Sequence, residues 1–375
     1  MGKSSTQIIY NVQALRALAA VGVLLDHLPD MLIRLGPASL ILTAGRSGVD
    51  IFFVISGFVM SLICHQGKIT PRQFLIDRWS RVAPLYWLAT LLVFALAALA
   101  PRLMQATVAS PVDFLDSLLF IPTTKSDGTI RPMLFVGWTI NYEMFFYTLF
   151  AMAKKITSTV RVAEDIVIIT LSALVASGAV YTFRNTALFF FSSPIVLEFA
   201  LGILVARIYA LKATLGKVRS FSLLLGGLFW MAIEPLLPVI EGKGFQESAQ
   251  HSWSIGLAAA AILLGALSLE KRRLVVRNRF IHTLGASSYA LYLIHPFVIR
   301  AGARLSSSID DTFHIWIATA VTCAAAISLA IAVHIIIEIP MTNRLRSFVK
   351  GYMILIISET KSRADEPSRG RRNHL

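Results

Sequence analysis

Two polar residues in the first apolar stretch of the chain, Arg16 and His27, have the types and the spacing to do chemistry inside a membrane. They are eleven positions apart within residues 12–32, so a helix places them within roughly 20° of the same face. A cation near the bilayer centre costs about 2.5 to more than 10 kcal/mol, which a partner or a function must offset. One interpretation is anchoring at the two membrane interfaces. The other is a protein-lined cavity in which the two residues react with a substrate.

A carboxylate follows in the segment WTINYEMFFY, where Glu143 lies a couple of turns into an otherwise aromatic and apolar helix. A buried carboxylate needs a neighbouring cation, or it takes up a proton. The expected depth of Glu143 is close to that of His27, so His27 and Arg16 are its candidate partners. The aromatic residues Trp138 and Tyr147 are expected to pack or to lie at the interface.

An arginine pair, Arg78 and Arg81, lies in the segment DRWSRVAPLYW, which leads into the third apolar stretch. Residues three positions apart share a helix face, so both guanidinium groups can act on one ligand. Guanidinium groups bind phosphate oxygens through paired hydrogen bonds. The pair is therefore either an anion site at the inner mouth of the protein or an ordinary basic anchor of a membrane span.

Three further polar residues, Asp50, Ser56 and His295, are candidates for contact with a substrate. Each also has a structural interpretation: Asp50 as a charge favoured at a helix N-terminus, Ser56 as a partner of its own backbone, and His295 as a satisfied histidine before Pro296. The carboxylates Glu198 and Glu338 are interpreted as structural.

The composition is that of an integral membrane protein. Of 375 residues, 56% are hydrophobic and 15% are charged, whereas soluble domains carry about 25% charged residues. The net charge of +14 is explained first by sorting of basic loops to the inner side of a membrane, not by nucleic acid, and no nucleic-acid partner is expected. The two cysteines, Cys64 and Cys323, both lie in apolar runs, so no structural disulfide is expected.

The apolar pattern predicts an all-α bundle of about ten membrane-spanning helices. The expected spans are residues 12–32, 48–64, 82–100, 136–153, 166–183, 188–206, 222–240, 253–269, 284–303 and 314–337. A short interfacial helix is expected in PVDFLDSLLF, between the third and fourth spans. Lysine and arginine are concentrated in alternate loops, which places both chain termini in the cytoplasm. The basic segment 358–375 is predicted to be a disordered cytoplasmic tail, which leaves residues 1–357 as the membrane domain.

The chain contains no phosphate-binding loop, no HExxH motif and no GxSxG motif, and its eight histidines are scattered. We therefore expect no metal site. Intramembrane Arg, His and Glu also suit a proton-coupled transporter or flippase for a glycan precursor. That alternative predicts an inverted repeat, which is not visible in the sequence. A third possibility is a structural subunit of a polysaccharide-synthesis complex.

Five segments in order resemble the acyltransferase-3 family of bacterial inner-membrane proteins, and above all its branch that O-acetylates exopolysaccharides. They are QALRALAAVGVLLDH, GVDIFFVISGF, FLIDRWSRVAPLYWL, WTINYEMFFY and LGASSYALYLIHP. The resemblance covers residues 11–340. It implies a multi-pass enzyme of the inner membrane that transfers an acyl group from cytosolic acyl-CoA to a sugar hydroxyl of an envelope glycan. Many members carry a further hydrolase-like domain, for which the segment after residue 357 is too short.

The resemblance also implies roles for individual residues. The family's Arg and His fall on Arg16 and His27, its arginine pair on Arg78 and Arg81, and its Glu on Glu143. Arg78 and Arg81 are expected to hold the phosphates of acetyl-CoA, whose acyl arm extends toward Arg16. His27 is expected to act as general base or as a transient acyl carrier, with Glu143 orienting it. The expected partners are the lipid bilayer, a polysaccharide or lipid-linked acceptor and polysaccharide-synthesis proteins.

Overall fold

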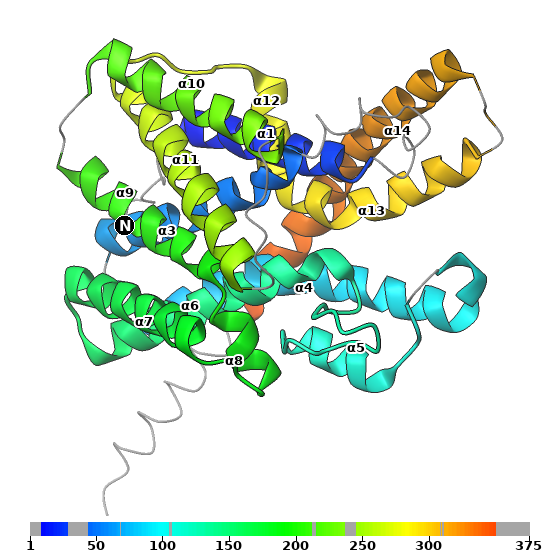
Figure 1. Ribbon diagram of the computed structural model, residues 1–375, viewed down its shortest axis with the longest axis horizontal. Helices are drawn as coiled ribbons and strands as arrows, with labels where there is room; N and C mark the ends of the chain where they lie inside the picture. The colour runs from blue at the N-terminus through cyan, green and yellow to red at the C-terminus, as the bar shows by residue number, and fades with distance from the viewer. Residues whose placement is uncertain are drawn as a thin grey trace, which may run out of the picture.

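The computed structural model describes residues 9–28, 44–67, 69–104, 107–211, 215–236, 245–307, 309 and 311–349. Within these ranges every regular element is a helix, and the only β pairing is an isolated bridge between Thr124 and Ile130. The expected all-α bundle is thereby confirmed (Figure 1). The predicted disordered tail, residues 358–375, lies outside the described residues.

The bundle is built from helices of very different lengths. They are α1 (Tyr10–Asp26), α3 (Gly48–Gln66), α4 (Pro71–Leu99), α5 (Pro111–Leu118), α6 (Trp138–Ile156), α7 (Val160–Val180), α8 (Thr186–Phe191), α9 (Leu197–Ala210), α10 (Lys217–Ile233), α11 (Phe245–Lys271), α12 (Arg279–Ala286), α13 (Ser288–Leu305) and α14 (Thr312–Val333). A π-helical turn, η6 (His334–Glu338), follows α14 directly, and the helix then continues to residue 349. Figure 1 shows α10 beside α11, α13 beside α14, and α6 beside α7, and each of these pairs is in contact.

Five described helical segments are long and apolar enough to cross a membrane. They are Ala44–Gln66, Pro71–Leu99, Val160–Val180, Trp253–Lys271 and Thr312–Val349. The other expected spans also coincide with helices, but those helices are shorter or more polar. The count of ten spans and the cytoplasmic position of both termini therefore stay predictions. The helix expected in PVDFLDSLLF is confirmed as α5.

The linker before the third span is helical, because α4 begins at Pro71 and not at residue 82. The start is capped by Thr70, whose side chain accepts a hydrogen bond from the amide of Gln73 at 3.2 Å. Proline at the first helical position has no amide hydrogen that would need a partner there. As a consequence, Arg78 and Arg81 lie on one continuous helix of 29 residues, one turn apart.

Two of the expected spans are interrupted. The sixth is divided into α8, a 3₁₀ turn at Pro194–Val196, and α9, because Ser193 before Pro194 adopts an extended conformation. The ninth is divided at Ser287 into α12 and α13. Apolar periodicity does not reveal such interruptions, since both halves keep the same hydrophobic character.

Glycines allow three helices near the N-terminus of the chain to pack closely. A Cβ atom added at Gly57 of α3 would lie 2.1 Å from the carbonyl oxygen of Phe199 in α9, and one at Gly202 would lie 2.1 Å from that of Val54. A Cβ atom at Gly48 would lie 2.3 Å from the carbonyl oxygen of Ala19 in α1. Small residues at such crossings bring backbones into van der Waals contact in a membrane. Gly48 and Gly57 thus have a packing role in the bundle.

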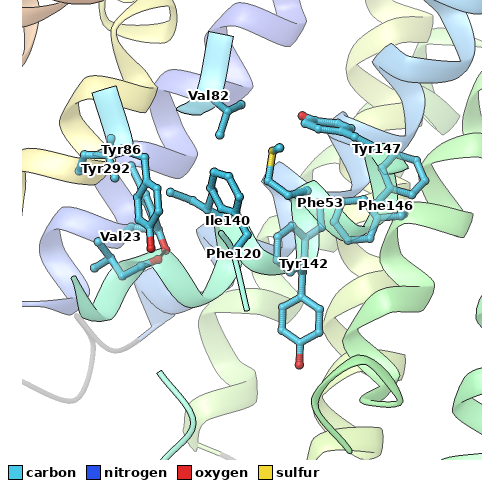
Figure 2. Close-up of a cluster of buried hydrophobic side chains, with 14 of the residues drawn as sticks. Val23, Phe53, Val82, Tyr86, Phe120, Ile140, Tyr142, Phe146, Tyr147 and Tyr292 are labelled. Atoms are coloured by element: carbon cyan, nitrogen blue, oxygen red, sulfur yellow. Dashed lines mark hydrogen bonds between the residues drawn. The ribbon is translucent and has the colours of Figure 1, made fainter. Parts of the chain in front are cut away.

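An aromatic core surrounds α6 at the centre of the bundle (Figure 2). The rings of Phe146 and Phe199 stack with centroids 4.4 Å apart, and those of Tyr142 and Phe190 stack at 4.1 Å. Tyr142 and Tyr147 are buried, so both contribute to packing. This core holds α4, α6 and α9 in fixed positions around the polar residues described below.

Loops that the charge pattern assigns to one side of the membrane do lie together. At one end of the bundle, His65 and Arg207 both bind the buried carboxylate of Glu164, at 2.9 and 2.8 Å. These three residues come from the C-terminal ends of α3 and α9 and the N-terminal start of α7. The assignment of this end to the cytoplasm stays a prediction.

Candidate active site

Arg16 lies among polar groups from three other helices. Its guanidinium donates to the hydroxyl of Ser288 in α13 at 2.9 Å. The charges that act on it belong to Arg81 of α4, Glu143 of α6 and Glu338 of η6. Arg16 is half-buried within the helical bundle, so it has protein partners and is not merely an interfacial anchor.

Glu143 is held by two hydroxyl groups. Its Oε1 accepts hydrogen bonds from Ser56 of α3 at 2.7 Å and from the hydroxyl of Tyr147, one turn later in α6. The hydroxyl of Ser56 thus donates to a carboxylate of another helix and not to its own backbone. Ser56 does not line the cavity described below. The sequence predicts that Tyr147 packs or lies at the interface, and its hydrogen bond adds a polar role.

The charge of Glu143 acts on Arg16, and no described contact joins Glu143 to His27. The hydrogen bonds of the described Glu143 carboxylate go to Ser56 and Tyr147, and its charge acts on Arg16. The carboxylate nearest His27 is instead that of its neighbour Asp26, at 3.8 Å. The expected orienting contact between Glu143 and His27 is therefore absent from the described contacts. Of the two partners proposed from the sequence, the structure favours the arginine.

His27 ends α1 and turns its ring back along the helix. Its Nδ1 lies 2.9 Å from the carbonyl oxygen of Val23. Because a carbonyl only accepts hydrogen bonds, Nδ1 carries the proton and donates it. In the neutral ring, Nε2 then keeps its lone pair. The side chain is 30% exposed and forms part of a cavity wall, so a base is available there to a ligand.

His295 lies directly behind His27. The two ring centroids are 4.8 Å apart at an interplanar angle of 68°. Its Nδ1 donates to the carbonyl of Leu291 at 3.1 Å, while Nε2 is buried and has no hydrogen-bond partner. His295 is 1% exposed and does not line the cavity. His295 therefore contacts His27, the predicted base, and does not reach the cavity in which a substrate would bind.

A cavity of about 950 Å³ opens beside His27 at the end of the bundle that is predicted to face outward. Its walls come from the segment between α4 and α6 and from the end of α13. Its charged lining residues are Asp113, Lys125, Asp127, Arg131, Arg300 and Arg304. Hydrogen bonds from Thr129 hold the pKa of Asp127 below its usual range, and Arg131 pairs with it at 2.5 Å. A space of this size and polarity suits a sugar unit.

Both side chains of the arginine pair are half-buried on α4, and neither lines the cavity. The Nε atom of Arg78 is buried without a hydrogen-bond partner. The charges of both arginines act on the hydroxyl of Tyr147, which binds Glu143. The pair is thus connected through polar side chains to the centre of the bundle, whereas an isolated surface anchor has no such connection.

Asp50 occupies a separate buried site. It is 2% exposed and lies in the first turn of α3, and its charge acts on Glu198, which is 0% exposed in the first turn of α9. Both carboxyl oxygens of Glu198 are buried without a hydrogen-bond partner among the described residues. Burial of two neighbouring carboxyl groups disfavours ionising both of them. Asp50 does not line the cavity, so the structure supports its helix-terminus interpretation more than the expected contact with substrate.

Four polar residues whose contacts or charges act on Arg16 or Glu143 are not among the site residues that the sequence predicts. They are Tyr147, Ser288, Tyr289 and Glu338. Ser288 and Tyr289 lie in the motif LGASSYALYLIHP, so that motif was a usable signal. Glu338 had been assigned a structural role, and only the fold shows that its charge acts on Arg16.

Comparison with known proteins gives a consistent result. A family model described as an acyltransferase domain matches residues 9–335. The exopolysaccharide production protein ExoZ of Rhizobium meliloti (strain 1021) is 34% identical over 315 residues, covering 81% of this chain and 92% of that protein. The acyltransferase MdmB of Streptomyces mycarofaciens is 25% identical, covering 88% and 90%. The O-acetyltransferase OatA of Staphylococcus aureus is 24% identical over 79% of this chain and 51% of its own length. No solved structure matches the chain significantly.

Proposed function

Because the chain belongs to the acyltransferase family and is an O-acetyltransferase enzyme, we propose that it moves an acetyl group from cytosolic acetyl-CoA to a sugar hydroxyl of an exopolysaccharide or another envelope glycan. The observation that carries the proposal is the placement of His27. This residue lines the polar cavity, and its Nε2 keeps a lone pair because Nδ1 donates to the carbonyl of Val23. The same helix carries Arg16, which connects this region to the arginine pair.

The donor side rests on Arg78 and Arg81. Coenzyme A carries several phosphate groups, and two guanidinium groups one helical turn apart can bind them. The buried Nε of Arg78 has no hydrogen-bond partner among the described residues, which suits a site that is completed by an anion. The acyl arm would then extend between the helices toward Arg16 and Tyr147.

The acceptor side rests on the cavity beside His27. The sugar hydroxyl loses its proton to Nε2 while its oxygen attacks the carbonyl carbon of the thioester. The carbon–sulfur bond breaks, and the imidazolium returns the proton to the thiolate of coenzyme A. In a two-step variant, Nε2 itself takes the acetyl group first and passes it to the hydroxyl. In either scheme Arg16 and Glu143 stabilise the polar centre of the bundle between α1, α3 and α6.

The acceptor class and the location are supported by relatives. ExoZ is named for exopolysaccharide production, and the five apolar helices require a membrane. We place the protein in the bacterial inner membrane, where lipid-linked or growing polysaccharide and the proteins that synthesise it are available. The transporter alternative is set aside, because the family is one of acyltransferases.

The test uses membranes that contain the protein, labelled acetyl-CoA and the envelope polysaccharide of the host. The expected result is label in the polysaccharide with wild-type protein and none with a stably expressed His27→Ala variant. Equal labelling by both proteins would rule out His27 as the reacting base. No labelling by the wild-type protein, together with no binding of acetyl-CoA, would rule out the proposed donor.

A further inference from the structure

A third arginine joins the arginine pair from the other end of the chain. After the π-helical turn η6, the helix continues along α4 and places Arg346 against the turn that contains Arg78. Its Nε donates to the hydroxyl of Ser80 at 3.2 Å, and its NH2 donates to the carbonyl of Asp77 at 3.3 Å. These contacts connect residues that are 266 and 269 positions apart.

The charges at this position are unbalanced. The charges that act on Arg78 include those of two other arginines, Arg81 and Arg346, and of one carboxylate, Asp77. Asp77 lies 3.8 Å from the Nε of Arg346, which is longer than a hydrogen bond. Like charges at short range are costly when they are partly shielded from water. A bound anion would reduce this repulsion.

The four arginines also have an order. The charge of Arg81 acts on Arg16, which contacts Ser288 of α13, and it also acts on Arg78. Arg346 contacts Asp77 and Ser80, and its side chain remains 34% exposed. In acyl-CoA the thioester, the diphosphate and the ribose 3′-phosphate follow one another along the molecule. A donor whose thioester points toward Arg16 therefore has its 3′-phosphate nearest the exposed end of the series.

We propose that Arg346 binds the ribose 3′-phosphate of the acyl-CoA donor. This inference rests on the proposed function, since it assumes that the donor is a CoA thioester. The π-helical turn contributes by shifting the helical register after α14, a distortion that often occurs at functional sites. The hydrogen bonds to Ser80 and Asp77 hold the guanidinium of Arg346 in place. The phosphate accepts hydrogen bonds from the other N–H groups of the same guanidinium.

The competing explanation is that Arg346 only fastens the last helix to α4. Three variants separate the two explanations. Arg346→Gln removes the charge but keeps a hydrogen-bonding side chain, and Asp77→Asn weakens the fastening but keeps all three arginines. Arg344→Gln removes an equal charge from an exposed position on the same helix and serves as the matched control.

The experiment measures binding of acetyl-CoA and of 3′-dephospho-acetyl-CoA to the purified full-length chain, with thermal unfolding as a check on folding. The wild-type protein is expected to bind acetyl-CoA about tenfold or more tightly than the dephospho compound, since a charge-assisted contact is lost. Arg346→Gln should abolish that difference while binding the dephospho compound like the wild type. Asp77→Asn and Arg344→Gln should keep the difference.

Each contrary result has a separate meaning. A preserved preference for the 3′-phosphate in Arg346→Gln would overturn the role of Arg346 and leave the proposed function intact. Failure of the wild-type protein to bind either compound would overturn the donor itself. If Arg346→Gln does not fold, Arg346→Lys is tested in its place, because a lysine keeps the charge but loses the planar fork. A reduced preference in that folded variant supports the role, and an unchanged preference with unchanged affinity contradicts it.

Discussion

His27 and His295 lie edge to face, with ring centroids 4.8 Å apart, although they belong to helices at opposite ends of the chain. Each ring donates from Nδ1 to a carbonyl of its own helix, four residues earlier. Both Nε2 atoms therefore keep lone pairs in the neutral state. His27 meets the cavity, whereas His295 is enclosed behind it. The pair thus consists of one accessible base and one buried neighbour that can stabilise the positive charge formed on it.

Replacing the accessible base should remove the chemistry but not the donor site. For His27→Ala we expect acetyl transfer to fall by about 10² to 10⁴, the usual contribution of a general base, with unchanged acetyl-CoA binding. Transfer is measured with labelled donor, and binding is measured on purified protein. His314→Ala is the control, because His314 is 66% exposed and does not line the cavity. Comparable losses in both variants would contradict a specific role for His27.

Replacing the buried neighbour should slow transfer without unfolding the protein. His295→Phe keeps a ring behind His27 and removes the Nε2 atom that has no partner, so we expect stability to change by less than about 1 kcal/mol. The turnover number should fall about tenfold at unchanged KM, because a lone pair that stabilises the imidazolium is lost. His295→Ala should instead destabilise the fold by about 2–4 kcal/mol through the cavity it leaves. Full turnover in the phenylalanine variant would show that His295 only fills space.

Substitutions of Arg16 and Glu143 should have non-additive effects on the free energy of unfolding. Glu143→Gln leaves the half-buried Arg16 with less compensation, and we expect a loss of about 1–3 kcal/mol, reduced by the remaining charge of Glu338. Arg16→Gln alone should have a similar cost. The double variant should recover part of the loss, as denaturant unfolding in a double-mutant cycle would detect. Strict additivity of the two single changes would show that the two groups do not interact.

Asp50 and Glu198 should be coupled as two neighbouring buried carboxyl groups. Asp50→Asn keeps the shape and removes one ionisable group, so we expect stability within about 1 kcal/mol of the wild type and normal transfer. Asp50→Ala should be clearly destabilised, since it leaves a cavity at a buried position. Thermal unfolding and labelled transfer measure the two properties. Loss of transfer in a stable Asp50→Asn protein would support contact with substrate instead.

The cavity loop should respond to acid through Asp127. Because its pKa is lower in the folded protein than the ordinary value of about 3.9, the ionised form stabilises the loop above that value. The contribution is lost as the pH falls through the folded pKa. Hydrogen exchange of residues 121–132 should therefore be slower in the wild type than in Asp127→Asn at pH 6. The difference should disappear in strong acid, and a difference that persists there would indicate another cause.

Local features of the site were predictable from the sequence. Arg16 and His27 share α1, and Arg78 and Arg81 lie one turn apart on α4, because helical periodicity depends only on residue spacing. The helices themselves followed from their apolar runs. Interruptions such as Ser193–Pro194 and the π-helical turn were not predicted, since the same hydrophobic pattern fits a straight helix.

The choice of partners was decided only by the tertiary structure. The sequence offered His27 and Arg16 equally to Glu143, and the packing of α3, α6 and α1 selected Arg16 and added Ser56. No pattern along the chain connects Arg346 with Arg78.

Spacing within one helix fixes which side chains share its face. Which helices meet depends on close crossings, such as the one at Gly57, and on where helices bend. The sequence alone therefore determined the class of protein, the helices and the reactive residue types. The fold determined which of these residues act together.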